Sequence, residues 1–218
     1  IPIIESPASA ESQCAYLVRN GISDYSNSQD FDSMVFGCPY LIQNLSKSLR
    51  RKNHGRWTYK KIDPLLIDLK ENLNRLEINQ FQLVDLVLLL KTDYFSGVKG
   101  IGPKTALNLI KKHNNIETIM RKERKEYNFS EINPDLIAKI RKIYLLPEVI
   151  DSFDDLMWNP PDRNRIFYLM CNDHNLNKER VKSNINKVID NFYKTLKHFQ
   201  FVLNQPKSVQ KTLDMVFS

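Results

Sequence analysis

The sequence predicts a mixed α/β fold in which short strands come first and helices fill most of the remaining chain. Two short apolar runs with the length of buried strands lie at 1–5 and 39–45. From residue 63 onward, apolar residues recur mostly at helical spacing. The 218 residues are 42% hydrophobic and 10% aromatic. This composition supports a sizeable core and is typical of a globular protein.

Charge and cysteine content restrict the possible partners and compartments. The net charge is +7 and the pI is near 9.2, which favours a polyanionic partner but is also found in basic proteins without one. Cys14, Cys38 and Cys171 have no CxxC spacing, which indicates free thiols in a reducing compartment. No apolar run reaches membrane-spanning length, so we expect no membrane partner. The chain starts at Ile1, and we expect it to be the later part of a longer protein.

The first elements are expected to be a strand, a helix and a second strand. The strand is the run at 1–5, and a helical apolar face follows from residue 10, with Gly21 as a plausible C-cap. Glu11 lies in the first turn of this helix, where a carboxylate favours the helix dipole. A short strand is expected around 24–26.

Two aspartates, Asp30 and Asp32, follow that strand two residues apart. Such a pair can converge on a divalent ion. It is also a common Asx-turn and N-cap pattern, and the residues alone leave both interpretations open.

The segment 47–61 holds seven basic residues and no acidic one, with Trp57 and Tyr59 between them. It is either a contact surface for the DNA backbone or a solvated loop, and we slightly favour the loop.

Two helices are expected next. Leucines at helical spacing predict one helix over 63–76, and a second should start at Asn79 and run to Lys91. Asp93 follows this apolar helix and should lie at the edge of the core, either as a helix cap or as a metal ligand.

A glycine-rich turn then leads into another helix. Gly97, Gly100 and Gly102 fall within six residues, and Pro103 is suited to the first helical position. A turn of this kind points unpaired N–H groups outward, which suits a phosphate, and Lys104 adds a positive charge. The helix at 103–113 should bury Ala106, Leu109 and Ile110. An ordinary helix–loop–helix with a glycine hinge is the alternative.

The rest of the chain is expected to be helical. Helices are predicted over 132–145, 164–171 and 177–201, with Trp158 packed in the core. The charge run 121–126 is expected to be solvated.

Three sequence stretches resemble one family. TDY at 92–94, GIGPKTALNLI at 100–110 and DFDSMVFG at 30–37 resemble motifs of the flap endonucleases, the XPG-type structure-specific 5′ nucleases. The resemblance covers roughly residues 1–40 and 78–185, the C-terminal part of such a nuclease. It implies a Rossmann-like (PIN-like) 5′ nuclease core, a helix–two-turn–helix DNA-binding region and extra C-terminal helices. The implied functional regions are 1–93, 94–203 and a tail at 204–218.

The resemblance also implies the catalytic chemistry. Glu11, Asp30, Asp32 and Asp93 would bind two Mg²⁺ ions about 4 Å apart, which hydrolyse a phosphodiester bond of a 5′ flap. Ser9 stands where the family pattern has a first glutamate, and serine cannot supply a carboxylate's charge. The family draws further acidic ligands from an N-terminal half that this sequence lacks. The alternative function is a catalytically impaired scaffold on a nuclease fold that binds DNA and the sliding clamp PCNA.

The resemblance implies two sets of contacts around the glycine turn. The duplex phosphates would be held by Gly100, Ile101, Gly102, Pro103, Lys104 and Thr105. A potassium ion would bind backbone carbonyls near Val98 and Ile101, although Gly97 stands in place of the usual hydroxyl ligand.

The tail carries a second implied partner. Gln210, Leu213, Val216 and Phe217 resemble the box that binds the sliding clamp PCNA. The implied role is DNA replication and repair, with 5′ exonuclease action as well, in the nucleus of a eukaryote or inside the cell otherwise.

Overall fold

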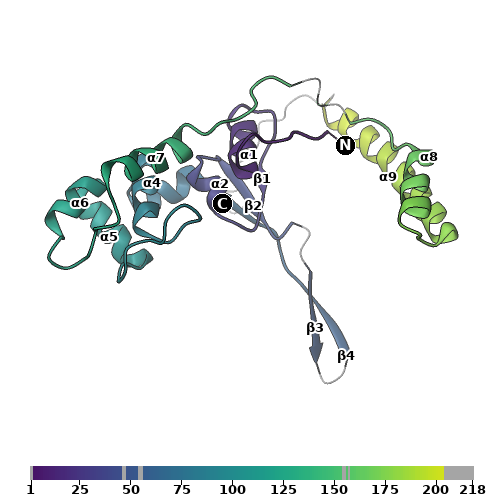
Figure 1. Ribbon diagram of the computed structural model, residues 1–218. Helices are drawn as coiled ribbons and strands as arrows, with labels where there is room; N and C mark the ends of the chain where they lie inside the picture. The colour runs from purple at the N-terminus through teal and green to yellow at the C-terminus, as the bar shows by residue number, and fades with distance from the viewer. Residues whose placement is uncertain (1, 46–47, 54–55, 154–155, 157, 204–218) are drawn as a thin grey trace, which may run out of the picture. The chain divides into compact units, whose positions relative to one another are not determined.

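The computed structural model describes residues 2–45, 48–53, 56–153, 156 and 158–203. The chain divides into two compact units (Figure 1). The larger unit is 4–153, and the smaller unit is 1–3 with 154–218. The units cut across the functional regions predicted at 1–93 and 94–203, because helices that follow residue 94 pack on the helix at Gln80–Leu89. Those regions stay a prediction.

A three-stranded sheet lies in the first half of the larger unit. Strands β1 (Ser26–Asn27), β2 (Tyr40–Gln43) and β5 (Leu65–Asp68) lie in the order β1-β2-β5. β1 is parallel to β2, and β5 is antiparallel to it. Helix α1 (Ala10–Arg19) contacts β1 and the short helix α2 (Asp32–Val35). This mixture of helices and sheet confirms the predicted α/β class.

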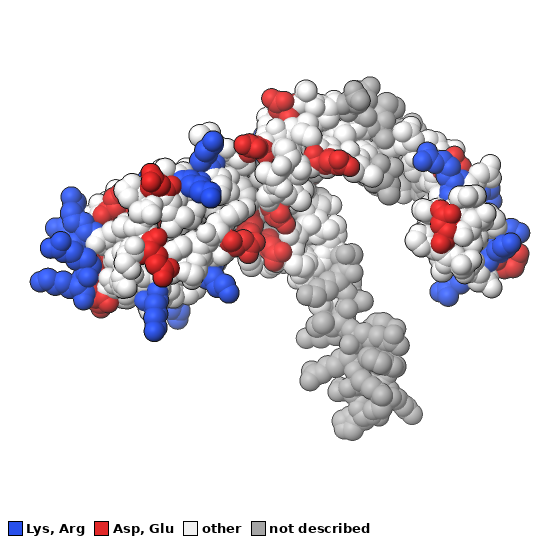
Figure 2. Space-filling model, in the orientation of Figure 1, with Lys and Arg blue, Asp and Glu red and all other residues white. Residues whose placement is uncertain are grey.

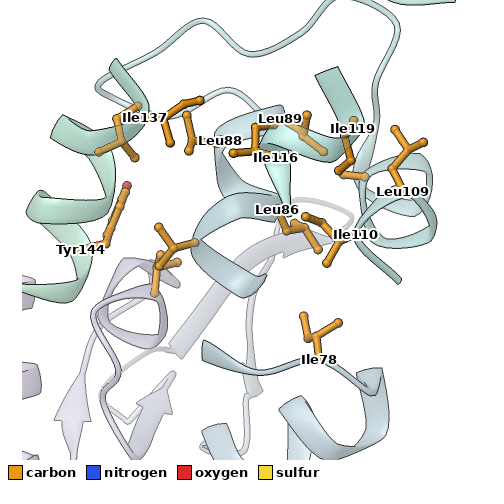
Figure 3. Packing of buried hydrophobic residues seen from close by; sticks show 14 of the residues in the cluster. Ile78, Leu86, Leu88, Leu89, Leu109, Ile110, Ile116, Ile119, Ile137 and Tyr144 are labelled. Carbon is orange, nitrogen blue, oxygen red and sulfur yellow. The ribbon is translucent and has the colours of Figure 1, made fainter. Parts of the chain in front are cut away.

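Helix α4 (Gln80–Leu89) is the centre of the core. A reciprocal capping box at Asn79 starts it, which confirms the predicted start. It contacts α5 (Pro103–His113), α6 (Ile116–Lys122) and α7 (Pro134–Leu145) (Figure 1). Figure 3 labels ten of the buried residues between these elements: Ile78, Leu86, Leu88, Leu89, Leu109, Ile110, Ile116, Ile119, Ile137 and Tyr144. The predicted bounds of α5 and its buried residues are confirmed.

One carboxylate is fully buried in this core. Asp85 of α4 accepts hydrogen bonds from Arg141 Nε at 2.8 Å and Nη2 at 2.7 Å, and from the backbone N–H of Ile116 at 3.0 Å. Arg141 also donates to Glu117 at 2.6 Å and lies over the Phe81 ring at 4.4 Å. Burial opposes the charge of Arg141, but the hydrogen bonds to the two carboxylates outweigh it and raise its pKa. The network fixes α4, α6 and α7 to one another.

Two predicted elements differ from the structure. Residues 2–5, predicted as a strand, have no regular secondary structure. The helix predicted over 63–76 begins instead as strand β5 and becomes helix α3 (Leu69–Leu76) only after Asp68, whose side chain caps it. Leu66 is 60% exposed, so the early leucines are not a buried helical stripe. Pairing with β2 decides the conformation of this segment.

Two further expectations are wrong. The backbone of the basic segment forms an antiparallel pair, β3 (Ser48–Asn53) with β4 (Arg56–Lys61), where a loop is predicted. Trp158 is 65% exposed rather than packed in the core.

The smaller unit is helical, as predicted. Helix α8 (Arg163–Tyr168) continues into a π-helical turn, η1 (Leu169–Asp173), and α9 (Lys178–Leu203) follows. Cys171, Val181 and Ile185 form its small buried cluster. None of the helices described here is long and apolar enough to cross a membrane. The predicted PCNA box lies outside the described residues.

Candidate active site

Four carboxylates line one cavity of about 620 Å³ in the larger unit. They come from three distant segments: Glu11 from the first turn of α1, Asp30 and Asp32 from the start of α2, and Asp93 from the segment after α4. Contacts of α2 with both α1 and α4 bring these segments together. Figure 2 shows acidic side chains gathered over the α1–α2 part of the unit and basic ones over the α5–α6 end.

Ser9 holds the Glu11 carboxylate. It occupies the N-cap position of α1, but its side chain caps no N–H group. Its Oγ donates instead to Glu11 Oε2 at 2.9 Å. Its carbonyl accepts hydrogen bonds from the hydroxyls of Ser6 and Ser12, both at 2.7 Å. The serine at this position therefore orients a carboxylate that lines the cavity.

Negative charge accumulates around Asp32. Its pKa is raised above the usual value, first by burial and then by the neighbouring charges of Asp93, Glu11 and Asp30. Asp30 is positioned by a hydrogen bond from its N–H to Ser28 Oγ at 3.1 Å. A divalent cation would relieve the mutual repulsion of these carboxylates.

A tight turn presents Asp93 to the cavity. Thr92 Oγ1 accepts hydrogen bonds from the N–H groups of Tyr94 at 3.2 Å and Phe95 at 3.1 Å, and Thr92 N–H donates to the Phe95 carbonyl at 2.8 Å. The Tyr94 ring packs edge-on against Tyr144, with centroids 5.8 Å apart. Burial and the charges of Asp32, Asp93 and Glu11 raise the pKa of Tyr94, so it stays protonated at neutral pH.

The glycine turn follows directly. Gly97 has φ +79°, and an added Cβ would lie 2.7 Å from backbone atoms of Leu90 and Lys91, so only glycine fits. The turn ends at Gly102, the N-cap of α5, with Pro103 at the first helical position. The backbone N–H groups in the first turn of an α-helix have no hydrogen-bond acceptor within the helix. The local geometry is that of an anion site.

Comparison with known proteins identifies the family. Residues 1–93 match the XPG I-region. The chain is 39% identical over 189 residues to flap endonuclease 1 of Sulfolobus acidocaldarius, covering 86% of this chain and 53% of the relative. It is 35% identical over 182 residues to that of Methanosarcina acetivorans, covering 84% and 52%. The chain belongs to the XPG family.

Solved structures agree with this XPG-family assignment. Flap endonuclease-1 from Methanococcus jannaschii matches with a TM-score of 0.70 and 28% identity, over 87% of this chain and 53% of that one. The catalytic core of Rad2 in complex with DNA substrate matches with a TM-score of 0.67 and 22% identity, over 87% and 62%, which shows the shared fold. The predicted 5′ nuclease fold is thereby confirmed. The chain spans about half the length of the curated relatives it matches.

The predicted metal ligands of this XPG-family chain line one cavity, but their side chains do not converge on a common position for a metal ion. Carboxylate oxygens are the donors that Mg²⁺ prefers, so the chemistry of the set fits that ion. Among the residues described, however, no three His, Cys, Asp or Glu side chains lie close enough together to hold a metal ion. The ligand assignment of Glu11, Asp30, Asp32 and Asp93 therefore stays a prediction, as does phosphate binding by the turn.

Sequence reasoning missed three features of the site. Lys91 lines the carboxylate cavity and adds a cation to it, and Tyr94 forms part of its wall. Both flank Asp93 in the sequence, which is the only signal that could have pointed to them. The hydrogen bond from Ser9 to Glu11 has no sequence signal, because it depends on the start of α1.

Proposed function

We propose that this chain is the C-terminal part of a structure-specific nuclease that cleaves 5′ flaps, with 5′ exonuclease action, in DNA replication and repair. One observation carries the proposal: four carboxylates from three segments line one cavity, in a chain related to flap endonucleases. The glycine turn follows one of these carboxylates within a few residues, which supports a role of this turn in holding DNA close to the carboxylates.

The proposed reaction is phosphodiester hydrolysis at metal ions held by the carboxylates. When bound, Mg²⁺ would supply an activated water and charge stabilisation at the leaving oxygen. Glu11, Asp30, Asp32 and Asp93 would hold two such ions, and Ser9 orients the first of these carboxylates.

In this proposal the turn that follows Asp93 binds the DNA. The segment from Gly100 to Thr105, with Lys104 at the start of α5, binds duplex phosphates. Phosphate contacts recognise the shape of the DNA without reading its sequence.

Two further partners belong to this proposal. The segment with Gln210, Leu213, Val216 and Phe217 would fold on binding to PCNA and insert its apolar side chains into a pocket. A potassium ion would bind carbonyls near Val98 and Ile101. The Val98 carbonyl already accepts a hydrogen bond from Ile101 N–H at 3.1 Å, and Gly97 offers no side-chain oxygen, so the mechanism uses no potassium-dependent step.

A cleavage assay tests the proposal. The natural full-length protein, with Mg²⁺, should cut a labelled 5′-flap duplex near the flap junction. Asp32→Ala should abolish the cutting and leave flap binding intact, because Asp32 is assigned to the metal and the turn to the DNA. Unchanged cleavage by Asp32→Ala would refute the assignment of the cavity.

A scaffold that binds DNA without cutting it is the second candidate. One observation favours it: Ser9 replaces a carboxylate of the family pattern. In this case the natural protein would bind the flap tightly without cutting it, and Ser9→Glu would not restore cleavage.

A further inference from the structure

A second cavity, of about 370 Å³, adjoins the carboxylate cavity. The two share Ser9 and Tyr94 in their linings, so one wall separates them. The Tyr94 ring is held on this wall by Tyr144, which itself packs against Phe36 with centroids 4.8 Å apart. The remaining apolar lining comes from Ala8, Phe36, Ile143, Leu146 and Pro147.

Two lysines of α7 give this cavity a cationic side. Lys139 and Lys142 lie three residues apart on the helix and are both exposed. Within the described part of the chain, neither forms an ion pair. Glu148 is the single carboxylate of the lining, so the cavity carries one net positive charge beside its acidic neighbour.

A side chain of α1 ties this helix to the segment that follows α7. Gln13 of α1 exchanges two hydrogen bonds with the backbone of Ile150, at 2.9 and 2.8 Å, shortly after α7 ends. The lysine side and the Ser9 side of the cavity are therefore fixed to each other.

We propose that this second cavity is a nucleotide subsite. It holds one nucleotide of the substrate strand next to the scissile phosphate, and this inference rests on the proposed nuclease function. Its volume falls within the range of small-ligand pockets. Lys139 and Lys142 neutralise the phosphate, and the apolar wall with Tyr94 receives the sugar and base. Because the cavities share a wall, a strand whose scissile phosphate lies at the carboxylates places its neighbouring nucleotide here.

The first test is the salt dependence of DNA binding. Binding of the natural full-length protein to flap DNA is measured by fluorescence anisotropy in EDTA over a range of salt concentrations. Lys139→Gln/Lys142→Gln, which keeps the side-chain bulk, should weaken binding about tenfold and reduce the slope of log K against log[salt] by about 0.7, for one lost single-strand phosphate contact. Lys70→Gln, an exposed lysine on α3, is the matched control and should change neither quantity.

The second test locates the contact. A flap substrate with one neutral methylphosphonate linkage beside the scissile phosphate should bind the parent protein more weakly. The double variant should bind the methylphosphonate substrate and the ordinary substrate equally well, because its contact with this phosphate is already lost. A linkage several nucleotides away in the duplex should weaken both proteins equally.

Two results would overturn the subsite. An unchanged salt slope and unchanged affinity for flap DNA in the double variant would mean that the lysines do not contact DNA. A lowered Tm of this variant would then indicate that they pack against polypeptide in the cavity. Equal effects of the adjacent neutral linkage on parent and variant would place the phosphate elsewhere. If the parent itself does not bind flap DNA, the proposed function fails first, which separates the two failures.

Discussion

The glycine turn and the carboxylate cavity are built in opposite ways. The turn is one continuous segment, and its conformation is set locally by Gly97 and by the proline that starts α5. The cavity draws its side chains from three segments that only tertiary packing brings together. The turn is thus built within one segment, with Val98 and Ile101 packed in the core, whereas the cavity combines packing of distant segments with charge repulsion.

The helical core and the cavity also differ in how their charges are neutralised. In the core, the buried Asp85 of α4 is paired with Arg141 and a backbone N–H. In the cavity, Asp32 meets three other carboxylates, which raise its pKa. The charge of Asp85 is neutralised within the chain, whereas the carboxylates of the cavity repel one another.

Arg141→Ala should have the largest effect. It leaves Asp85 buried without its cationic partner, which should lower the free energy of unfolding by about 3–5 kcal/mol. Urea unfolding measures the change. The double variant Asp85→Leu/Arg141→Leu should be more stable than Arg141→Ala, because no charge is then left unpaired. A double variant as unstable as the single one would contradict this account of the pair.

Gly97→Ala should destabilise the protein by about 3 kcal/mol, because the new Cβ meets backbone atoms at 2.7 Å and φ is positive. Gly102→Ala is the matched control: it lies in the same turn, without positive φ and with no atom within 4 Å of an added Cβ. Thermal unfolding of both variants gives the comparison. Equal loss in the two would show that the close approach at Gly97 does not shape the turn.

Lys104→Ala should weaken duplex binding by about 1 kcal/mol and reduce the salt slope by about 0.9, uniformly across DNA sequences. Its position in the first turn of α5, where N–H groups face an anion, is the reason. Anisotropy titrations on two unrelated duplex sequences measure the effect. A loss confined to one sequence would mean that the turn reads bases.

Asp32→Asn should have the smallest effect on stability, and in the opposite direction. Because the folded-state pKa is raised, Asp32 contributes stability below its unfolded value of 3.8, and this contribution is lost as pH rises through the folded value. At neutral pH the metal-free variant should be more stable by a few tenths of a kcal/mol, since exposure screens the repulsion. The gain should vanish in acid.

The control for this measurement is Asp63→Asn, an exposed aspartate outside the cavity, which should give no gain at any pH. A loss of stability in Asp32→Asn at neutral pH would mean that the carboxylate is favourably paired in the folded protein.

Local patterns in the sequence predicted local structure well. The bounds of α5, the cap at Asn79 and the positions of the four acidic residues at element ends all follow from spacing and residue type. The strand β5 was missed because pairing with β2 overrides a leucine spacing that fits a helix equally well. The lysines beside the two cavities were missed because only the packing of α7 and α4 brings them there.

Calorimetric titration of Mg²⁺ into the natural full-length protein tests whether the four carboxylates form one site for divalent ions. Asp32→Asn should lower Mg²⁺ affinity by at least about tenfold, while binding of flap DNA in EDTA is unchanged. Equal Mg²⁺ affinity in the parent and the variant would contradict the account, because Asp32 would then lie beside the metal site rather than in it.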